Sequence, residues 1–223
     1  MREEYPNLVQ GTDEWHAARR GILTSSVIGQ LVTPKTRKVA SNAESRALVM
    51  QLAAERITGQ SDPGFVSDDM FRGISSEPIV RALYEKHTGL TVREVGFMRI
   101  EEPGWELGYS PDGVIGDDGL IEIKCPRAKE HLRTMVSGEV PPQYMAQCQA
   151  ALLVSGRGWI DYVSYCAGMT LWIRRAHPNP NWQEALIEAA KACEASISHV
   201  LAGYEEASEG LPATEPIVDD IIV

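Results

Sequence analysis

The stretch YSPDGVIGDDGLIEIKC, residues 109–125, constrains the fold more than any other part of the chain. Its central GDDG, residues 116–119, is typical of a tight turn that joins two antiparallel strands. Because side chains alternate along a strand, one face of the second strand is apolar while the other carries Glu122 and Lys124. The turn folds the first strand back, so we expect Asp112 to lie near these two charges.

A buried strand that carries Glu122 and Lys124 needs compensation, because burying a charge without a partner is costly. A divalent cation would supply it, since Mg²⁺ binds carboxylate oxygens and retains several waters. Such an ion polarises a phosphoryl oxygen and lowers the pKa of a bound water, while the nearby ammonium group can orient that water. The sequence therefore predicts phosphodiester hydrolysis at Asp112, Glu122 and Lys124. The alternative at this stage is an edge strand with a surface Glu–Lys pair, which contributes less than about 1 kcal/mol.

Capping residues, glycine stops and apolar spacing predict an α/β fold in which a mixed central β-sheet is flanked by α-helices. Helices are expected over residues 12–20, 25–32, 41–58, 75–88, 141–155 and 181–204. Besides the strand before the GDDG turn, strands are expected within residues 91–100, 105–109, 120–125, 159–166 and 169–175. We expect residues 1–204 to form a single domain, residues 60–69 to form a loop within it, and residues 205–223 to form an acidic tail.

Several classes of protein are poorly supported by the composition. No apolar run reaches the roughly 18 residues that a membrane-spanning helix needs, and the N-terminal residues lack a signal-peptide core, so we expect a cytoplasmic protein. The four cysteines are widely spaced without a C-x-x-C pair, which disfavours zinc ribbons and iron–sulfur sites. The five histidines form no pair with metal-ligand spacing.

Charge is distributed unevenly along the chain, whose formal net charge is −10. Residues 19–46 contain six basic residues and one acid, whereas residues 194–223 contain seven acids and no Lys or Arg. Only the basic N-terminal third is expected to attract a polyanion. Within it, Lys35, Arg37 and Lys38 occupy an expected loop, residues 33–41, that is suited to contacts with a nucleic-acid backbone.

Four ordered motifs resemble those of a known group of enzymes. Ser110-Pro-Asp-Gly113 followed by Glu122-Ile-Lys124-Cys-Pro126 resembles the PD-(D/E)xK core of restriction-endonuclease-like nucleases, and within them the phage lambda exonuclease and YqaJ-type viral recombinase family. The other three motifs match in chain order and are Trp15-His-Ala-Ala-Arg19 with Gly21 and Thr24-Ser-Ser26, Gly73-Ile-Ser-Ser-Glu77, and Tyr144-Met-Ala-Gln147-Cys-Gln149. The resemblance covers residues 15–149, about two-thirds of the chain.

The resemblance implies a Mg²⁺-dependent exonuclease, with Mn²⁺ as a substitute, that digests linear double-stranded DNA from the 5′ end and leaves a 3′ single strand. By position, Asp112 and Glu122 would be metal ligands, and Glu77 would be a further acid that supports the metal or its waters. Lys124 would be the catalytic lysine, and Gln147 would position the water or that lysine.

The same resemblance implies a pocket for the 5′-phosphate. Arg19 matches the arginine that binds this phosphate, and a guanidinium group pairs with phosphate oxygens bidentately. Ser26 and Ser110 match hydroxyl groups that could complete the pocket. Met70 falls where the family uses an apolar wedge between the DNA strands, with ordinary packing as its alternative.

The same resemblance implies partners for the protein and leaves two alternative functions. The resemblance implies a ring-shaped homotrimer around DNA and a single-strand annealing protein that takes over the 3′ strand, in phage or prophage recombination within a bacterial host. One alternative is an endonuclease with the same core that does not require DNA ends. Another is a DNA-end-binding protein without catalytic activity, which the complete set of Glu77, Asp112, Glu122 and Lys124 disfavours.

Overall fold

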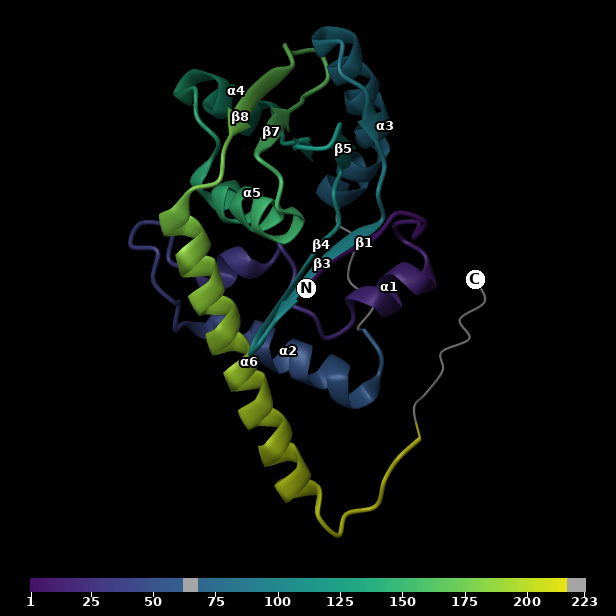
Figure 1. The fold of residues 1–223 in the computed structure, drawn as a ribbon, viewed down its shortest axis with the longest axis vertical. Helices are drawn as coiled ribbons and strands as arrows, with labels where there is room; N and C mark the ends of the chain where they lie inside the picture. The colour runs from purple at the N-terminus through teal and green to yellow at the C-terminus, as the bar shows by residue number, and fades with distance from the viewer. Residues whose placement is uncertain (62–67, 216–223) are drawn as a thin grey trace.

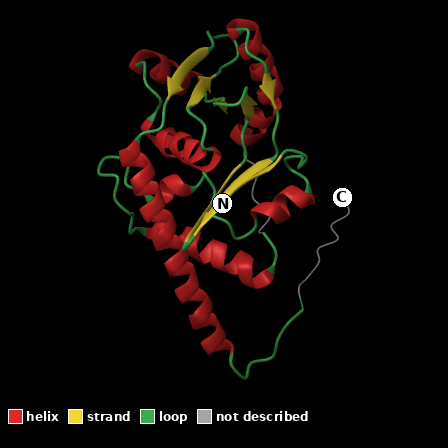
Figure 2. Cartoon of the chain, viewed as in Figure 1, coloured by secondary structure: helices red, strands yellow, loops and turns green. Residues whose placement is uncertain are grey.

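The computed structural model describes residues 1–61 and 68–215, whose helices and strands are arranged around two separate β-sheets (Figure 1, Figure 2). The helices are α1 (Asp13–Arg19), a 3₁₀ helix η1 (Ile28–Leu31), α2 (Ala43–Thr58), α3 (Asp68–Thr88), α4 (Ala128–Ser137), α5 (Pro142–Ser155) and α6 (Pro180–Ser208). The strands are β1 (Arg2–Tyr5), β2 (Val92–Arg93), β3 (Phe97–Glu102), β4 (Trp105–Tyr109), β5 (Gly113–Ile115), β6 (Gly119–Lys124), β7 (Trp159–Ser164) and β8 (Trp172–Ala176).

The five-stranded sheet has the order β2-β5-β6-β7-β8. β6 and β7 are parallel while the other neighbours are antiparallel, so the predicted mixed sheet is confirmed. Ile115 pairs with Gly119 across the GDDG turn, which confirms the hairpin that the sequence predicts. A second, three-stranded antiparallel sheet, β1-β3-β4, runs diagonally below the first in Figure 1, and the sequence does not predict this division.

β6 is covered on both faces, which explains why charges on it need partners. Ile121 and Ile123 pack against Val80 and Tyr84 of α3 in one hydrophobic cluster. The opposite face begins with Leu120, which belongs to the main core together with residues of α5. Glu122 lies on this second face and is 1% exposed. The alternative prediction, an edge strand with a surface Glu–Lys pair, is therefore wrong.

Local signals set most helix ends as predicted. The side chain of Thr12 accepts a hydrogen bond from the Trp15 N–H and caps α1. α2 ends at Gly59, whose φ of 66° suits a residue without a side chain. The capping box of α2 is formed by Asn42 and Ser45 rather than by residues 41 and 44, because each of these side chains accepts a hydrogen bond from the other's backbone N–H.

α3 differs most from its sequence prediction. It begins at Asp68, seven residues before the expected start at Ser75, so Pro78 lies inside the helix instead of in its first turn. Proline has no N–H, so the carbonyl group of Ile74 loses its helical donor, which is the usual reason to expect a helix boundary there. Residues 62–67 of the expected 60–69 loop lie outside the described residues.

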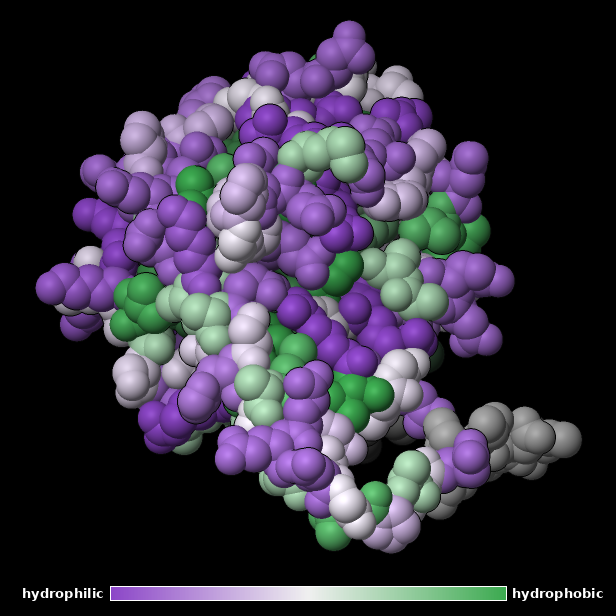
Figure 3. Space-filling model, turned by 60° about the horizontal axis from the view of Figure 1, so that its bottom comes forward, coloured by the Kyte–Doolittle hydropathy of each residue, from purple (hydrophilic) through white to green (hydrophobic). Residues whose placement is uncertain are grey.

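Other elements also depart from expectation. α4 and β1 are not predicted, and the expected helix over residues 25–32 is reduced to the single 3₁₀ turn η1. α6 packs against α2 and α5 and continues to Ser208, four residues beyond its expected end at residue 204. The face shown in Figure 3 is mainly hydrophilic, with apolar residues in small separate areas. Within the described residues, no helix has the length and apolar character that a bilayer crossing requires.

Candidate active site

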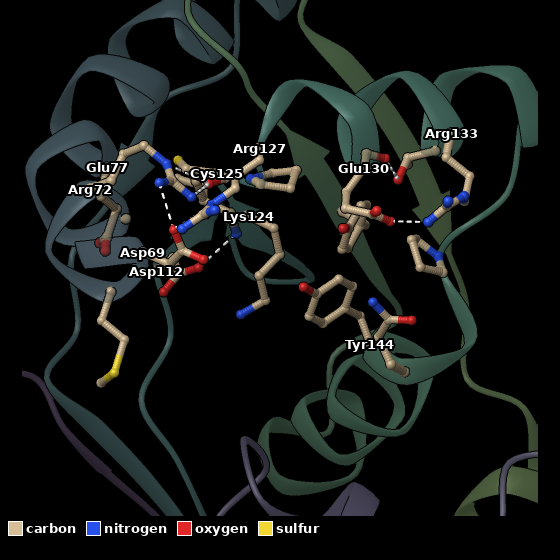
Figure 4. Close-up of a pocket in the computed structure, with 18 of the residues that line it drawn as sticks. Asp69, Arg72, Glu77, Asp112, Lys124, Cys125, Arg127, Glu130, Arg133 and Tyr144 are labelled. Atoms are coloured by element: carbon tan, nitrogen blue, oxygen red, sulfur yellow. Dashed lines mark hydrogen bonds and ion pairs between the residues drawn. The ribbon is translucent and has the colours of Figure 1, made fainter. Parts of the chain in front are cut away.

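A cleft of about 760 Å³ opens between α3 on one side and α4 and α5 on the other, at the end of β6 (Figure 4). Glu77 of α3, Asp112 before β5 and Lys124 at the end of β6 line it, and Tyr144 of α5 faces them. Figure 4 shows the Lys124 side chain between Asp112 and Tyr144, and its Nζ lies 5.4 Å from the centre of the tyrosine ring. The structure therefore brings two of the predicted acids and the lysine to one cleft, while the third acid, Glu122, contacts Lys124 from beneath the cleft surface.

The hairpin register places Asp112 beside β6. Gly113 pairs with Ile121, so residue 112 lies opposite the next residues of that strand. The backbone N–H of Ile123 donates to Asp112 Oδ2 at 2.6 Å. This hydrogen bond fixes the carboxylate next to Glu122 and Lys124, as the sequence predicts.

Glu122 is held by two side chains that the sequence also singled out. Its Oε1 accepts hydrogen bonds from Gln147 Nε2 at 2.5 Å and from Lys124 Nζ at 2.6 Å. Its Oε2 is buried and has no hydrogen-bond partner among residues 1–61 and 68–215. The Tyr109 hydroxyl group is likewise buried without a hydrogen-bond partner in the same ranges. Burial is the main cause that raises the pKa of Tyr109, and the negative charge of Glu122 is the second.

The electrostatics of this cluster of carboxyl groups favour the binding of a cation. Burial and the charge of Glu122 hold the pKa of Asp112 well above its usual range, against the effect of Lys124. Burial likewise raises the pKa of Glu77, although Arg81 opposes the rise. For Lys124, burial opposes the charged form, but the charges of Glu122 and Asp112 outweigh it and raise the pKa. Lys124 is therefore an ammonium group at neutral pH.

These residues fit a hard divalent ion held by two carboxylates. No group of three His, Cys, Asp or Glu side chains within the described ranges is arranged to hold a metal ion together. Mg²⁺ is commonly bound by one or two carboxylates, with waters and substrate oxygens completing its shell. Asp112 and the unpartnered Oε2 of Glu122 would be such a pair. Glu77 remains a predicted support for the metal or its waters.

Arg81, which lies one helical turn after Glu77, also contacts the acids of the cleft and is not among the residues that the sequence predicts. Its Nη1 donates to Glu77 Oε1 at 2.5 Å and to the backbone carbonyl oxygen of Asp112 at 2.9 Å. The spacing of four residues between Glu77 and Arg81 on a helix could have predicted the ion pair. The contact with Asp112 has no local sequence signal, because it depends on where the hairpin lies.

Two of the three residues predicted to bind the 5′-phosphate, Arg19 and Ser110, are in contact at the C-terminal end of α1. Arg19 Nη1 donates a hydrogen bond to Ser110 Oγ, and its guanidinium carbon lies 4.1 Å from the centre of the Trp15 ring. Trp15 Nε1 also donates to Ser110 Oγ, at 3.1 Å. Within the described residues Arg19 forms no ion pair with a carboxylate, and burial lowers its pKa to about 10. A partly buried guanidinium group without an anion is suited to bind a phosphate.

No described contact links Ser26, the third predicted phosphate ligand, to Arg19 or Ser110. Thr24, two residues before it, forms an isolated parallel bridge with Gly108 of β4, and the chain turns directly afterwards. The Ser26 hydroxyl group pairs with Thr24 Oγ1 at 3.1 Å.

The remaining predicted DNA contacts lie in two different places. Met70 of α3 is 53% exposed and lines the cleft. Lys35, Arg37 and Lys38 are exposed in the loop between η1 and α2, and none of the three lines the cleft.

Comparison with known proteins identifies a family and similar solved structures for the chain. A model of the YqaJ-like viral recombinase domain matches residues 14–158. The crystal structure of LHK-Exo, an alkaline exonuclease from Laribacter hongkongensis, is 31% identical with a TM-score of 0.79 and covers 90% of this chain and 100% of its own. The structure of LHK-Exo in complex with dAMP gives the same values.

A phage related exonuclease from Haemophilus somnus 129PT has a TM-score of 0.61 at 10% identity, covering 82% of this chain and 96% of its own, which shows a shared fold only. No curated protein shows significant sequence similarity to the chain. The family match and the likeness to LHK-Exo nevertheless agree over most of the chain. The protein therefore belongs to the YqaJ-like viral recombinase family, whose alkaline exonuclease relatives indicate that it is a nuclease.

Proposed function

We propose that the protein is a Mg²⁺-dependent exonuclease that digests linear double-stranded DNA from 5′ to 3′ and leaves 3′ single-stranded overhangs. The observation that carries this proposal is the cluster in which partly buried Asp112 and Lys124 line an open cleft and adjoin the buried Glu122. The Arg19–Ser110 pocket begins two residues before Asp112. A phosphate anchor beside a hydrolytic cluster suits an enzyme that starts at a DNA end.

The side chains divide the work in the cleft. Asp112 and Glu122 Oε2 would hold Mg²⁺, which when bound supplies a polarised phosphate oxygen and a more acidic water. Gln147 and Lys124 engage Glu122 Oε1 and so leave the other oxygen available. Lys124, charged at neutral pH, is placed to orient the attacking water or to neutralise charge that develops on the phosphate.

The phosphate pocket would select the DNA end and the bond to be cut. Ser110 and Asp112 are separated by one residue, so their Cα atoms are at most roughly 7 Å apart. A terminal phosphate bound by Arg19 and Ser110 would place the first internucleotide bond near Asp112. The related LHK-Exo structure with dAMP supports a site of this family that accommodates a nucleotide.

The wider setting is part of the same proposal. The chain would act as a ring-shaped homotrimer around linear duplex DNA, with Met70 between the strands and Lys35, Arg37 and Lys38 on the backbone. It would deliver the 3′ strand to a single-strand annealing protein during phage or prophage recombination in the cytoplasm of a bacterial host. Mn²⁺ would substitute for Mg²⁺ as the metal cofactor.

One assay separates this proposal from its rivals. Linear duplexes with 5′-phosphate or 5′-hydroxyl ends and closed circular duplexes are incubated with Mg²⁺ or with EDTA. We expect loss of linear DNA only, fastest from 5′-phosphate ends and absent in EDTA. Cutting of circles would support an endonuclease instead, and binding of linear DNA without loss would support an inactive end-binding protein.

Replacing Arg19 by alanine is expected to remove the preference for 5′-phosphate ends. A hydrogen bond to a charged group contributes about 1.5–3 kcal/mol, so the ratio of rates on phosphate and hydroxyl ends should fall by about tenfold or more. Initial rates on the two linear substrates measure this ratio. Arg20→Ala is the matched control because it removes the adjacent guanidinium group, which has no described contact with Ser110. An unchanged ratio in Arg19→Ala would show that Arg19 does not bind the terminal phosphate.

A further inference from the structure

Arg81 occupies the space between the two segments that carry the acids of the cleft. It extends from α3, and its Nη1 contacts both Glu77 Oε1, at 2.5 Å, and the Asp112 carbonyl oxygen, at 2.9 Å. Its Nη2 forms an ion pair with Glu94 Oε2 at 3.1 Å. The Arg81 side chain is only 15% exposed, so solvent screens these interactions weakly.

Through these contacts Arg81 orients two separate acids, Glu77 and Asp112. One nitrogen fixes the orientation of the Glu77 carboxylate, and the same nitrogen fixes the backbone from which the Asp112 side chain projects. The other end of Asp112 is fixed by the Ile123 N–H. Arg81 therefore completes a frame in which α3 and the β5–β6 hairpin hold their carboxylates at a constant separation.

An arginine next to a cation site needs an explanation, because it repels the ion that the site is built to bind. Arg81 cannot act as a ligand, since a guanidinium group has donors but no acceptor. Its planar fork can instead hold two acceptors in a fixed geometry, which a lysine ammonium group does less well. Side chains that orient metal ligands in this way typically change metal affinity or activity by about 10–100-fold when removed.

We propose that Arg81 is a positioning residue for the divalent-ion site, acting through Glu77 and through the backbone of Asp112. This inference rests on the proposed Mg²⁺ site and is independent of the direction in which DNA is digested. A purely structural role, in which Arg81 only connects α3 to the hairpin, makes a different prediction: stability would fall while the affinity for metal stayed the same.

The test measures metal binding directly. Mn²⁺ is titrated calorimetrically into the wild-type protein and into Arg81→Met without DNA, and thermal unfolding is followed in EDTA. We expect Arg81→Met to raise the Kd for Mn²⁺ by about 10–100-fold. Arg93→Met is the matched control because Arg93 pairs with Glu4 at an exposed site, and it should bind Mn²⁺ like the wild type.

Two further variants make the test specific. If Arg81 acts partly through Glu77, the double variant Arg81→Met with Glu77→Gln should weaken Mn²⁺ binding by less than the product of the two single effects. Arg81→Lys keeps the charge without the fork and should fall between wild type and Arg81→Met. It also carries the test if Arg81→Met does not fold.

Three results would overturn the inference: wild-type Mn²⁺ affinity in Arg81→Met or Arg81→Lys, effects that multiply fully in the double variant, or an equal loss of affinity in Arg93→Met. Absence of Mn²⁺ binding by the wild-type protein would remove the metal site and this role together. Digestion from 3′ ends, by contrast, would contradict the proposed polarity and leave the role of Arg81 intact.

Discussion

Replacing Lys124 by methionine is expected to lower the rate of DNA hydrolysis by about 10²–10⁴-fold, because a charged group aimed at the reacting phosphate or its water would be lost. Methionine retains much of the apolar length that lies near Tyr144. Binding of linear DNA should persist, since the Arg19 pocket and the exposed basic loop are unchanged. Single-turnover rates with Mg²⁺, together with the Kd for DNA in EDTA, separate the two effects.

Lys191→Met is a matched control for this variant. Lys191 also pairs with a glutamate, Glu188, but both side chains are at least half exposed on α6. Its removal should leave hydrolysis unchanged. Wild-type rates in Lys124→Met would contradict the catalytic role of this lysine, and a parallel loss of DNA binding would indicate general damage to the cleft.

Replacing Asp161 by alanine is expected to produce the largest loss of stability among the substitutions considered. Asp161 is 3% exposed and accepts hydrogen bonds from Tyr84 at 2.6 Å and from two nitrogens of Arg175, each at 2.8 Å. Arg175 also lies 3.5 Å from the centre of the Trp159 ring. The carboxylate thus joins α3, β7 and β8.

Removal of one partner from a buried ion pair costs about 3–5 kcal/mol. Arg175 is 43% exposed and can turn toward water, so we expect the lower end of this range, about 3 kcal/mol. Urea unfolding measures the difference. Asp117→Ala, an exposed acid of the GDDG turn, is the control and should change stability by less than about 0.5 kcal/mol. A loss of that same small size for Asp161→Ala would show that the network is not needed for stability.

The hairpin and its acids were predictable because their signals are local. The GDDG turn fixes the register of β5 and β6, and alternation along the strand then places Glu122 and Lys124 together. Helix caps act over three or four residues, which is why α1 and the end of α2 were also predicted well.

Elements that depend on distant partners were not predictable in the same way. β1 is a strand because Glu3 pairs with Arg99, far along the chain. The N-cap residue of α4, Arg127, provides no side-chain hydrogen bond, so the start of this helix carries no capping signal in the sequence. Its position depends on His131, which is fully buried and hydrogen-bonded to Ser164 and to the Thr170 carbonyl group.

The candidate site shows the same division. Asp112, Glu122 and Lys124 follow from the hairpin, whereas the Arg19–Ser110 contact spans 91 residues and was suggested only by family resemblance. The role of Arg81 is not predictable from the sequence because its second acceptor is a backbone carbonyl group, and contacts with the backbone do not depend on the identity of the residue that supplies it.

The segment Ser110-Pro-Asp112 joins β4 of one sheet to β5 of the other. Its middle residue, Pro111, has a restricted φ angle, which narrows the range of spacings between the two ends. In an enzyme that binds a DNA end at Ser110 and cleaves at Asp112, this short segment would set the distance between the bound end and the cleaved bond. The size of each released fragment would then be set by covalent geometry instead of by loop motion.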